Sequence, residues 1–461
     1  MIFKGIGSSG SERSRRALGW RGWACLLGWA LSGTNVWADA ADPLPTASSS
    51  PPDTLTLPVA DAQDPDYPAR RKSQFPSGFG YAVFPYPYSL PGLGSGLSVV
   101  AGAANVADTP TDTYGIVFGG DVKGAALGVS DIHLLPRRLI LDLGYARLSR
   151  ASIETYSTRG MESRKDDFRL LEVGDTAFYG GRLTGTFVDR RFEVYGAWYG
   201  GASRLKSIRD ADGELILAAQ NAPREHVETH IFGGRIDLTD DYADPRRGMR
   251  LEVSRTQSPS AGSDASYYVM DYSAAGYVPV GKRNTWAFNL FRSDAVVKRR
   301  GETDPVKLQN ETGLQCDQLT DPTLLGYCQQ VIDNMAAENR FGTATQLGGF
   351  SRLRGYPQGR FKGAHTLFMG TEFRWNLNEE ETPFDLFVMK DVRTLMQVAF
   401  FYETGVSSDT ASDLWKRKNM RDTVGAGFRI VTASGVVLRA DMGFSRDGPG
   451  AAVFIGYPWE L

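Results

Sequence analysis

Side chains that usually carry catalysis or bind metal ions are scarce in this chain, which has four His and three Cys among 461 residues. In "EHVETH", His226, Glu228 and His230 are spaced two apart, so in a strand they share one face and could hold a metal ion. Ordinary wall residues give the same spacing, and we expect neither a metal ion nor another cofactor. The sequence contains no G-x-S-x-G nucleophile elbow. We therefore expect a protein that is not an enzyme.

One polar run stands out by its chemistry, "GGFSRLRGYPQGRFKG" (348–363). It has too much Gly for a helix and too little apolar surface for a strand, so it predicts a loop. Arg354, Gly355 and Tyr356 lie at its centre. The run is either a solvated basic loop or a loop whose Arg binds buried carboxylates, because a guanidinium is a rigid five-donor fork. The surrounding elements must distinguish the two.

The elements around this run are segments of eight to fourteen residues in which apolar and polar side chains alternate. In 366–377, Met369 and Trp375 lie on one face and Glu372 and Arg374 on the other. A soluble sandwich and a membrane barrel with a charged lumen both give this pattern. Segment length favours the barrel, since membrane strands need about 9–11 residues and globular strands average about 5–6.

The N-terminal region predicts export. Residues 1–38 have a basic start and a short apolar core, "ACLLGWAL" (24–31), typical of a signal peptide, although a cytosolic N-terminus with a chance apolar run gives the same letters. Residues 39–78 form a Pro-rich linker. Residues 39–461 carry 46 basic and 52 acidic residues, so we expect no nucleic-acid partner. We expect the barrel to occupy 79–461.

The C-terminal residues resemble the terminal signal of bacterial outer-membrane barrels. Tyr457, Trp459 and Leu461 continue an apolar alternation to the last residue, with Leu461 in place of the usual aromatic residue. Two cysteines, Cys316 and Cys328, follow the signal peptide, and in an oxidising compartment they are expected to form a disulfide rather than two free thiols.

Motifs in a fixed order resemble the BamA/TamA-like outer-membrane assembly-factor superfamily. They are "LRGY" (353–356), "GTE" (370–372) and "FYETG" (401–405), preceded by the Asp-rich turn and strand at 237–253. Glu403 stands where the family usually has Asp, which keeps the charge. The resemblance implies an all-β transmembrane antiparallel barrel of sixteen strands, whose sixth extracellular loop folds inward.

In that family the loop Arg sits against acidic residues of the inner wall. The resemblance therefore implies that Arg354 pairs with Glu372 or Glu403, that Gly355 permits a tight chain path and that Tyr356 packs on the wall. Too few residues precede the barrel for one of the family's POTRA domains. The Gly-rich stretch 92–97, assigned to the first strand, and Pro458, assigned to the last, predict a weak seam between these strands.

The resemblance implies a non-enzymatic role in biogenesis of the outer membrane of a Gram-negative bacterium, by inserting or moving protein or lipid through the seam. The partners would be outer-membrane lipids and other envelope proteins. The alternative is a passive channel or a surface-exposed binding protein on the same scaffold. An inward-folded loop argues against an open pore, because Arg354 would occupy the lumen.

Overall fold

The computed structural model describes residues 79–459, apart from 220–221, 242–243, 261–262, 313, 315, 379–382, 387–388 and 433–436. The expected signal peptide and linker, and Leu461, lie outside the described residues. No helix in the described part of the chain is long and apolar enough to cross a membrane.

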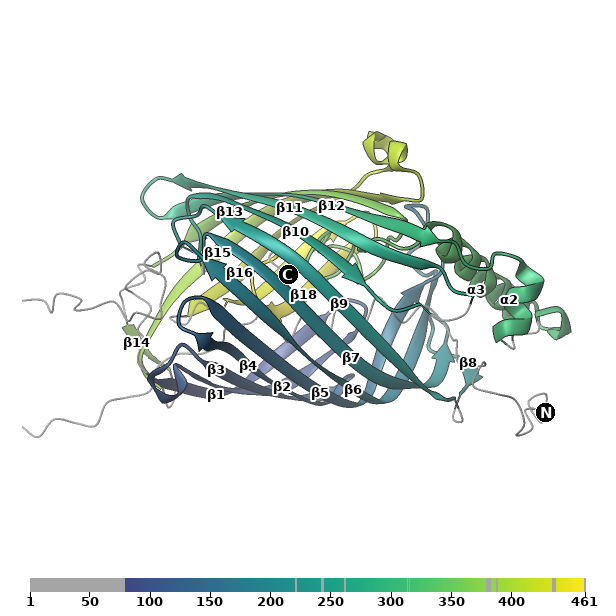
Figure 1. Cartoon of the computed structure of the whole chain (residues 1–461), viewed down its shortest axis with the longest axis horizontal. Helices are drawn as coiled ribbons and strands as arrows, with labels where there is room; N and C mark the ends of the chain where they lie inside the picture. The colour runs from purple at the N-terminus through teal and green to yellow at the C-terminus, as the bar shows by residue number, and fades with distance from the viewer. Residues whose placement is uncertain are drawn as a thin grey trace, which may run out of the picture.

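Sixteen long strands form a closed antiparallel barrel, as predicted (Figure 1). Two short strands, β8 (Leu215–Ala218) and β14 (Pro383–Leu386), extend individual hairpins. The barrel strands are β1 (Gly80–Leu90), β2 (Gly94–Ala104), β3 (Asp112–Gly120), β4 (Lys123–Leu135), β5 (Leu139–Tyr156), β6 (Phe168–Phe187), β7 (Phe192–Arg209), β9 (Arg224–Asp237), β10 (Gly248–Gln257), β11 (Ser266–Val280), β12 (Asn284–Arg299), β13 (His365–Asn376), β15 (Met389–Ser408), β16 (Arg421–Thr432), β17 (Val437–Ser445) and β18 (Gly448–Ile455).

The two faces of the strands have opposite environments. On β16, which pairs with β15 and β17, Val424 and Phe428 are exposed on the outside of the barrel. Arg429 on the same strand is fully buried inside the barrel. On β17, Met442 is exposed and Asp441 is buried. Apolar side chains outside and charged side chains inside fit a barrel whose outer face meets lipid. The alternation of apolar and charged side chains therefore indicates a wet or hydrogen-bonded lumen rather than an apolar core.

Alternate strand connections lie at opposite ends of the barrel. At one end the turns are short, as at 136–138 and 281–283. At the other end, the connection between β12 and β13 spans 300–364 and carries α2 (Pro305–Thr312), a 3₁₀ turn (Cys316–Gln318) and α3 (Pro322–Phe341). We call 300–364 the sixth loop, because it is the sixth connection at that end, and 348–363 its tip. Five barrel strands follow it, as expected.

A disulfide joins Cys316, in the 3₁₀ turn of the sixth loop, to Cys328 on α3, with Cα atoms 5.5 Å apart. Leu308 and Ile332 pack on it in a small buried cluster. The helices lie beyond the strand ends, outside the barrel wall (Figure 1). The disulfide thus closes a local unit that is separate from the tip.

Two details of the predicted seam strands were wrong. The Gly-rich stretch 92–97 forms the β1–β2 turn and the start of β2, not the first strand. β18 ends at Ile455, so Tyr457 and Trp459 do not extend its apolar face. Gly456 has a positive φ of 99° and Pro458 has no N–H to donate, and together these residues turn the chain out of the strand.

Candidate functional site: the loop dock and the seam

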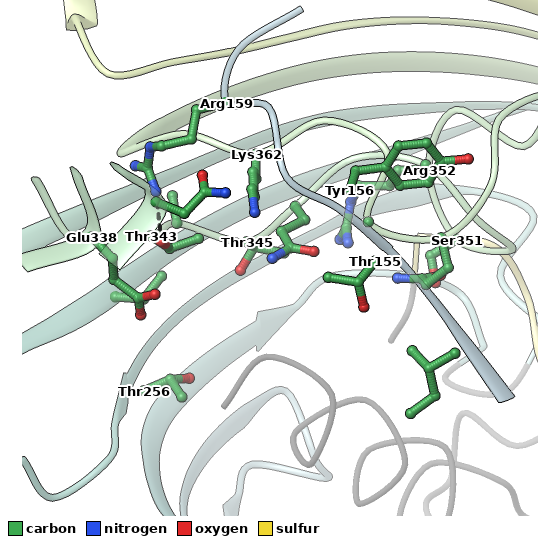
Figure 2. A pocket seen from close by; sticks show the side chains of 18 of the residues that line it. Thr155, Tyr156, Arg159, Thr256, Glu338, Thr343, Thr345, Ser351, Arg352 and Lys362 are labelled. Atoms are coloured by element: carbon green, nitrogen blue, oxygen red, sulfur yellow. Dashed lines mark hydrogen bonds between the residues drawn. The ribbon is translucent and has the colours of Figure 1, made fainter. Parts of the chain in front are cut away.

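The sixth loop is tied to neighbouring connections both at its tip and just before it. The Arg159 side chain, from the β5–β6 connection, donates to Asp409, to Thr343 Oγ1 (2.9 Å) and to the Gly342 carbonyl (2.7 Å); Figure 2 shows Arg159 beside Thr343. Arg360 on the tip donates to Ser163 Oγ (2.6 Å) and to Asp447 (3.1 Å). These contacts hold the tip against the barrel mouth from two sides.

The inner end of the tip places Arg354 in the centre of the lumen, where its side chain is fully buried. Its backbone N–H and its Nε donate to the two oxygens of Glu403 at 2.8 and 2.9 Å. Its Nη1 donates to Asp441 at 2.7 Å and its Nη2 to Glu372 at 3.2 Å. One guanidinium thus binds both carboxylates named from the sequence and a third one, on three different strands.

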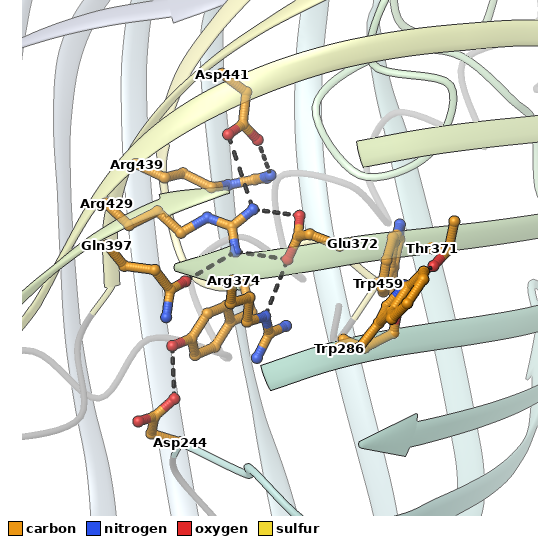
Figure 3. Close-up of polar contacts among 12 residues, drawn as sticks. Asp244, Trp286, Thr371, Glu372, Arg374, Gln397, Arg429, Arg439, Asp441 and Trp459 are labelled. Atoms are coloured by element: carbon orange, nitrogen blue, oxygen red, sulfur yellow. Dashed lines mark hydrogen bonds and ion pairs between the residues drawn. The ribbon is translucent and has the colours of Figure 1, made fainter. Parts of the chain in front are cut away.

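The three carboxylates have unequal further support (Figure 3). Glu372 also accepts from Arg374 Nε at 2.9 Å and from both Nη atoms of Arg429. Asp441 also accepts from Arg439 Nη1 at 2.9 Å. Buried charges are stable only when they are paired, so this set of guanidiniums and carboxylates acts as one network. We call it the loop dock; its charged members are Arg354, Glu372, Arg374, Glu403, Arg429, Arg439 and Asp441.

Glu403 depends on Arg354 more than the other two carboxylates do. Apart from Arg354, its hydrogen-bond donor among the described residues is Trp459 Nε1, at 3.0 Å. Trp459 comes from the chain beyond β18, and so does Tyr457, whose hydroxyl donates to Asp244 at 2.7 Å. The Tyr457 ring lies 3.9 Å from the Arg374 guanidinium. The residues expected to end the last strand instead close the dock from inside the barrel.

The sequence motifs did not name several members of the dock. Asp441, Arg374, Arg429 and Arg439 lie on the inward face of their strands, and the period-two pattern already separated them from the apolar face. Their convergence on one carboxylate set needs the barrel to close, since they come from three strands. Trp459 could not be found this way, because the alternation assigned it to the outer face.

Gly355 lies where the tip touches the wall. A Cβ atom at Gly355 would lie 2.9 Å from Ser445 Cβ and 2.9 Å from Thr423 Cγ2. On the facing strand, a Cβ at Gly443 would lie 2.7 Å from the Gly355 backbone N. Glycine on both sides therefore allows direct backbone contact. Tyr356 is buried and its ring packs at 4.9 Å, edge-on, against Phe361.

The seam between the first and last strands is the second candidate feature. β1 pairs with β2 along all of Gly80–Leu90, but with β18 through one residue pair, Ser89 and Val453. β1 contains Pro85 and Pro87, which cannot donate to a neighbouring strand. The Tyr86 hydroxyl bridges the seam and donates to the Phe454 carbonyl at 3.0 Å. The seam is weak, although for a reason other than the glycines named from the sequence.

The histidine-containing segment does not form a metal site. Glu228 accepts a hydrogen bond from Trp198 Nε1 at 2.7 Å and lies 3.0 Å from His230 Nε2. These side chains and His226 are at the barrel surface near the start of β9. Within the described residues, no group of three His, Cys, Asp or Glu side chains is arranged to hold a metal ion.

Comparison with known proteins gives a family match for half of the barrel. Residues 229–450 match the Omp85 superfamily domain, which confirms the resemblance drawn from the motifs. No curated protein sequence matches the chain.

Solved structures similar to this chain include BamA from Haemophilus ducreyi lacking POTRA domains 1–3, with 12% identity, a TM-score of 0.44, and coverage of 81% of this chain and 69% of that one. CdiB from Escherichia coli has 14% identity, a TM-score of 0.43, and coverage of 80% and 61%. CdiB from Acinetobacter baumannii has 10% identity, a TM-score of 0.41, and coverage of 83% and 66%. This chain thus spans less than two thirds of either CdiB chain.

The closed barrel, its apolar outer face and the Omp85 domain together place the protein in the outer membrane of a Gram-negative bacterium.

Proposed function

We propose that this Omp85-type barrel acts without enzymatic chemistry in outer-membrane biogenesis, by admitting protein or lipid at the seam between β1 and β18. The observation that carries the proposal is the pairing of these strands through Ser89 and Val453 alone. In hydrocarbon, an unpaired backbone N–H or C=O costs several kcal/mol. A barrel that leaves most of one strand edge unpaired has a built-in site for an incoming strand or an acyl chain.

The loop dock supports a lateral route over a central one. The tip, Tyr457 and Trp459 occupy the lumen, and the charged dock crosses it from β13 to β17. A passive channel would need these residues to leave together. A seam needs only β1 and β18 to separate, and few backbone hydrogen bonds oppose that movement.

A disulfide across the seam tests the proposal. The variant Ser89→Cys/Val453→Cys should cross-link β1 to β18 under oxidation, since these residues are direct cross-strand partners. The control Val99→Cys/Val117→Cys joins partners in the fully paired β2–β3 ladder. We expect the seam cross-link to raise outer-membrane permeability to large antibiotics in cells that depend on the variant, and reductant to restore the barrier.

The control cross-link should leave the permeability barrier intact. Because the control variant also contains the native Cys316–Cys328 disulfide, reductant affects that disulfide equally in both variants. A seam cross-link that forms fully and changes nothing would refute the lateral route. Impairment by both cross-links alike would show a general effect of stiffening the wall and would also count against it.

A further inference from the structure

A cavity of about 300 Å³ lies between the sixth loop and the inner wall, beside the loop dock (Figure 2). Its lining comes from β5, β6, β10 and β11 on the wall side and from α3 and 343–362 on the loop side. Hydroxyl and amide side chains predominate among the small residues, as with Thr155, Thr256 and Gln346, and aromatic rings such as Tyr267 and Tyr327 add flat surfaces. The cavity therefore combines polar groups with apolar surface and has room for a molecule much larger than water.

Two cations of the tip face this cavity without a partner. The Arg352 side chain makes no hydrogen bond or ion pair with any described residue, although the residue is only 7% exposed. Its guanidinium carbon lies 3.7 Å from the centre of the Phe291 ring, so one face is covered by an aromatic surface. Lys362 also lines the cavity, and its ammonium likewise has no hydrogen-bond or ion-pair partner in the described part of the chain.

The carboxylates around the cavity are already engaged. Glu252 accepts from Arg235 and Tyr195, whereas Glu154, Asp271 and Glu338 accept from the hydroxyls of Tyr156, Thr345 and Tyr267. Arg159, a third lining cation, is bound to Asp409. Arg352 and Lys362 are therefore the lining cations whose side chains have no hydrogen-bond or ion-pair partner among the described residues.

Burial disfavours the charged form of both side chains. It lowers the pKa of Arg352 to about 10, with Asp271, Glu403 and Glu252 only partly opposing the shift. It lowers the pKa of Lys362 to about 8, where Glu338 and Asp409 oppose the shift and Arg159 adds to it. A buried cation without a counter-ion is unfavourable, and a bound anion would remove the penalty.

We propose that this cavity binds an organic phosphate, with the phosphate held by Arg352 and Lys362 and a hydroxylated body filling the remaining space. Phosphate suits a guanidinium fork and an ammonium point charge together. The volume exceeds the need of a bare anion, and the hydroxyl, amide and aromatic lining fits a glycerol or sugar moiety. The phosphate could belong to a soluble molecule or to a lipid headgroup, and both present the same chemistry.

Binding can be measured on the full chain in detergent with glycerol 3-phosphate as the soluble probe and glycerol as its uncharged match. Titration calorimetry should show binding of the phosphate and none of glycerol. In a second arm, native mass spectrometry of protein from nanodiscs with and without phosphatidylglycerol tests the lipid source. Binding in the first arm assigns a soluble ligand, and retention of the lipid alone assigns a headgroup.

The variants Arg352→Gln and Lys362→Gln should each weaken binding by about tenfold or more, since each removes one charge-assisted contact, and the double variant should abolish it. Arg340→Gln, an exposed cation of the same loop outside the cavity, should bind like the wild type. Without ligand, Arg352→Gln should melt no lower than the wild type, because it removes an unpaired buried charge.

Absence of binding in both arms would overturn the proposal, and so would binding that Arg352→Gln and Lys362→Gln leave unchanged. Arg352→Lys provides a check on folding, since it keeps the charge but loses the fork. Arg352→Lys should retain part of the affinity for glycerol 3-phosphate. If Arg352→Lys bound no phosphate while Arg352→Gln bound it like the wild type, the assignment would be contradicted.

Discussion

Replacing Arg354 with Ala tests the loop dock most directly, because the change removes one guanidinium and leaves three buried carboxylates in place. Glu372 keeps Arg374 and Arg429, and Asp441 keeps Arg439. Glu403 keeps only the indole N–H of Trp459 among the described residues. The penalty should therefore fall mainly on Glu403.

Its size follows from the burial of the pair. Removing one partner of a buried ion pair costs about 3–5 kcal/mol, because the other charge stays buried without compensation. Applied to the equilibrium between docked and undocked tip, this is a shift of roughly two to four powers of ten. We expect Arg354→Ala to populate the undocked tip measurably.

Trypsin provides the assay, because the tip still contains Arg352, Arg360 and Lys362 after the substitution, and these residues are buried or partly buried in the docked state. Cleavage at these three sites should be much faster in Arg354→Ala than in the wild type. Cleavage at Lys307 and Arg340, which are exposed on α2 and α3, should not change and serves as the internal control.

Second substitutions identify the carboxylate responsible. Glu403→Gln should slow cleavage of the Arg354→Ala tip, since it removes the uncompensated charge. Glu372→Gln should not slow cleavage, because it removes the carboxylate that pairs with Arg374 and Arg429 and leaves these cations less well compensated. Wild-type cleavage rates in Arg354→Ala, or equal rescue by Glu403→Gln and Glu372→Gln, would refute this account of the dock.

Three further predictions follow from other contacts. Gly443→Val should displace the tip and cost about 1–3 kcal/mol of stability by overpacking. Gly276→Val should leave the tip in place, because no atom lies within 4 Å of its Cβ position. Equal trypsin sensitivity of the tip in the two variants would contradict this. Replacing Cys316 and Cys328 with Ser should speed proteolysis within α2 and α3 but leave tip cleavage unchanged, because the disulfide lies outside the lumen. Lys362 has a folded pKa of about 8 against 10.5 when unfolded, so the unfolded chain binds more protons between these values and stability should rise with pH across that window. Lys362→Met should lack this part of the rise in melting temperature, and identical pH slopes would count against it.

The sequence by itself determined the fold class and the location of the sixth loop. Period-two alternation is a local property, since successive side chains of a strand must point to opposite faces, and Glu372 and Arg374 were assigned to the polar face by that rule alone. The Gly- and Arg-rich composition of 348–363 likewise marked a loop without knowledge of its surroundings. Cys316 and Cys328 could be paired because the third cysteine, Cys25, lies in the expected signal peptide.

Only the tertiary structure decided which charges meet and where the weak seam lies. Arg354 reaches Glu372, Glu403 and Asp441 together because barrel closure brings β13, β15 and β17 around the tip, and no spacing along the chain encodes that convergence. The path of Trp459 depended on the left-handed turn at Gly456, which reversed the face that alternation had assigned to it. The single-pair contact between β1 and β18 depends on how two strands at opposite ends of the chain align in space, and local sequence carries no information about that register.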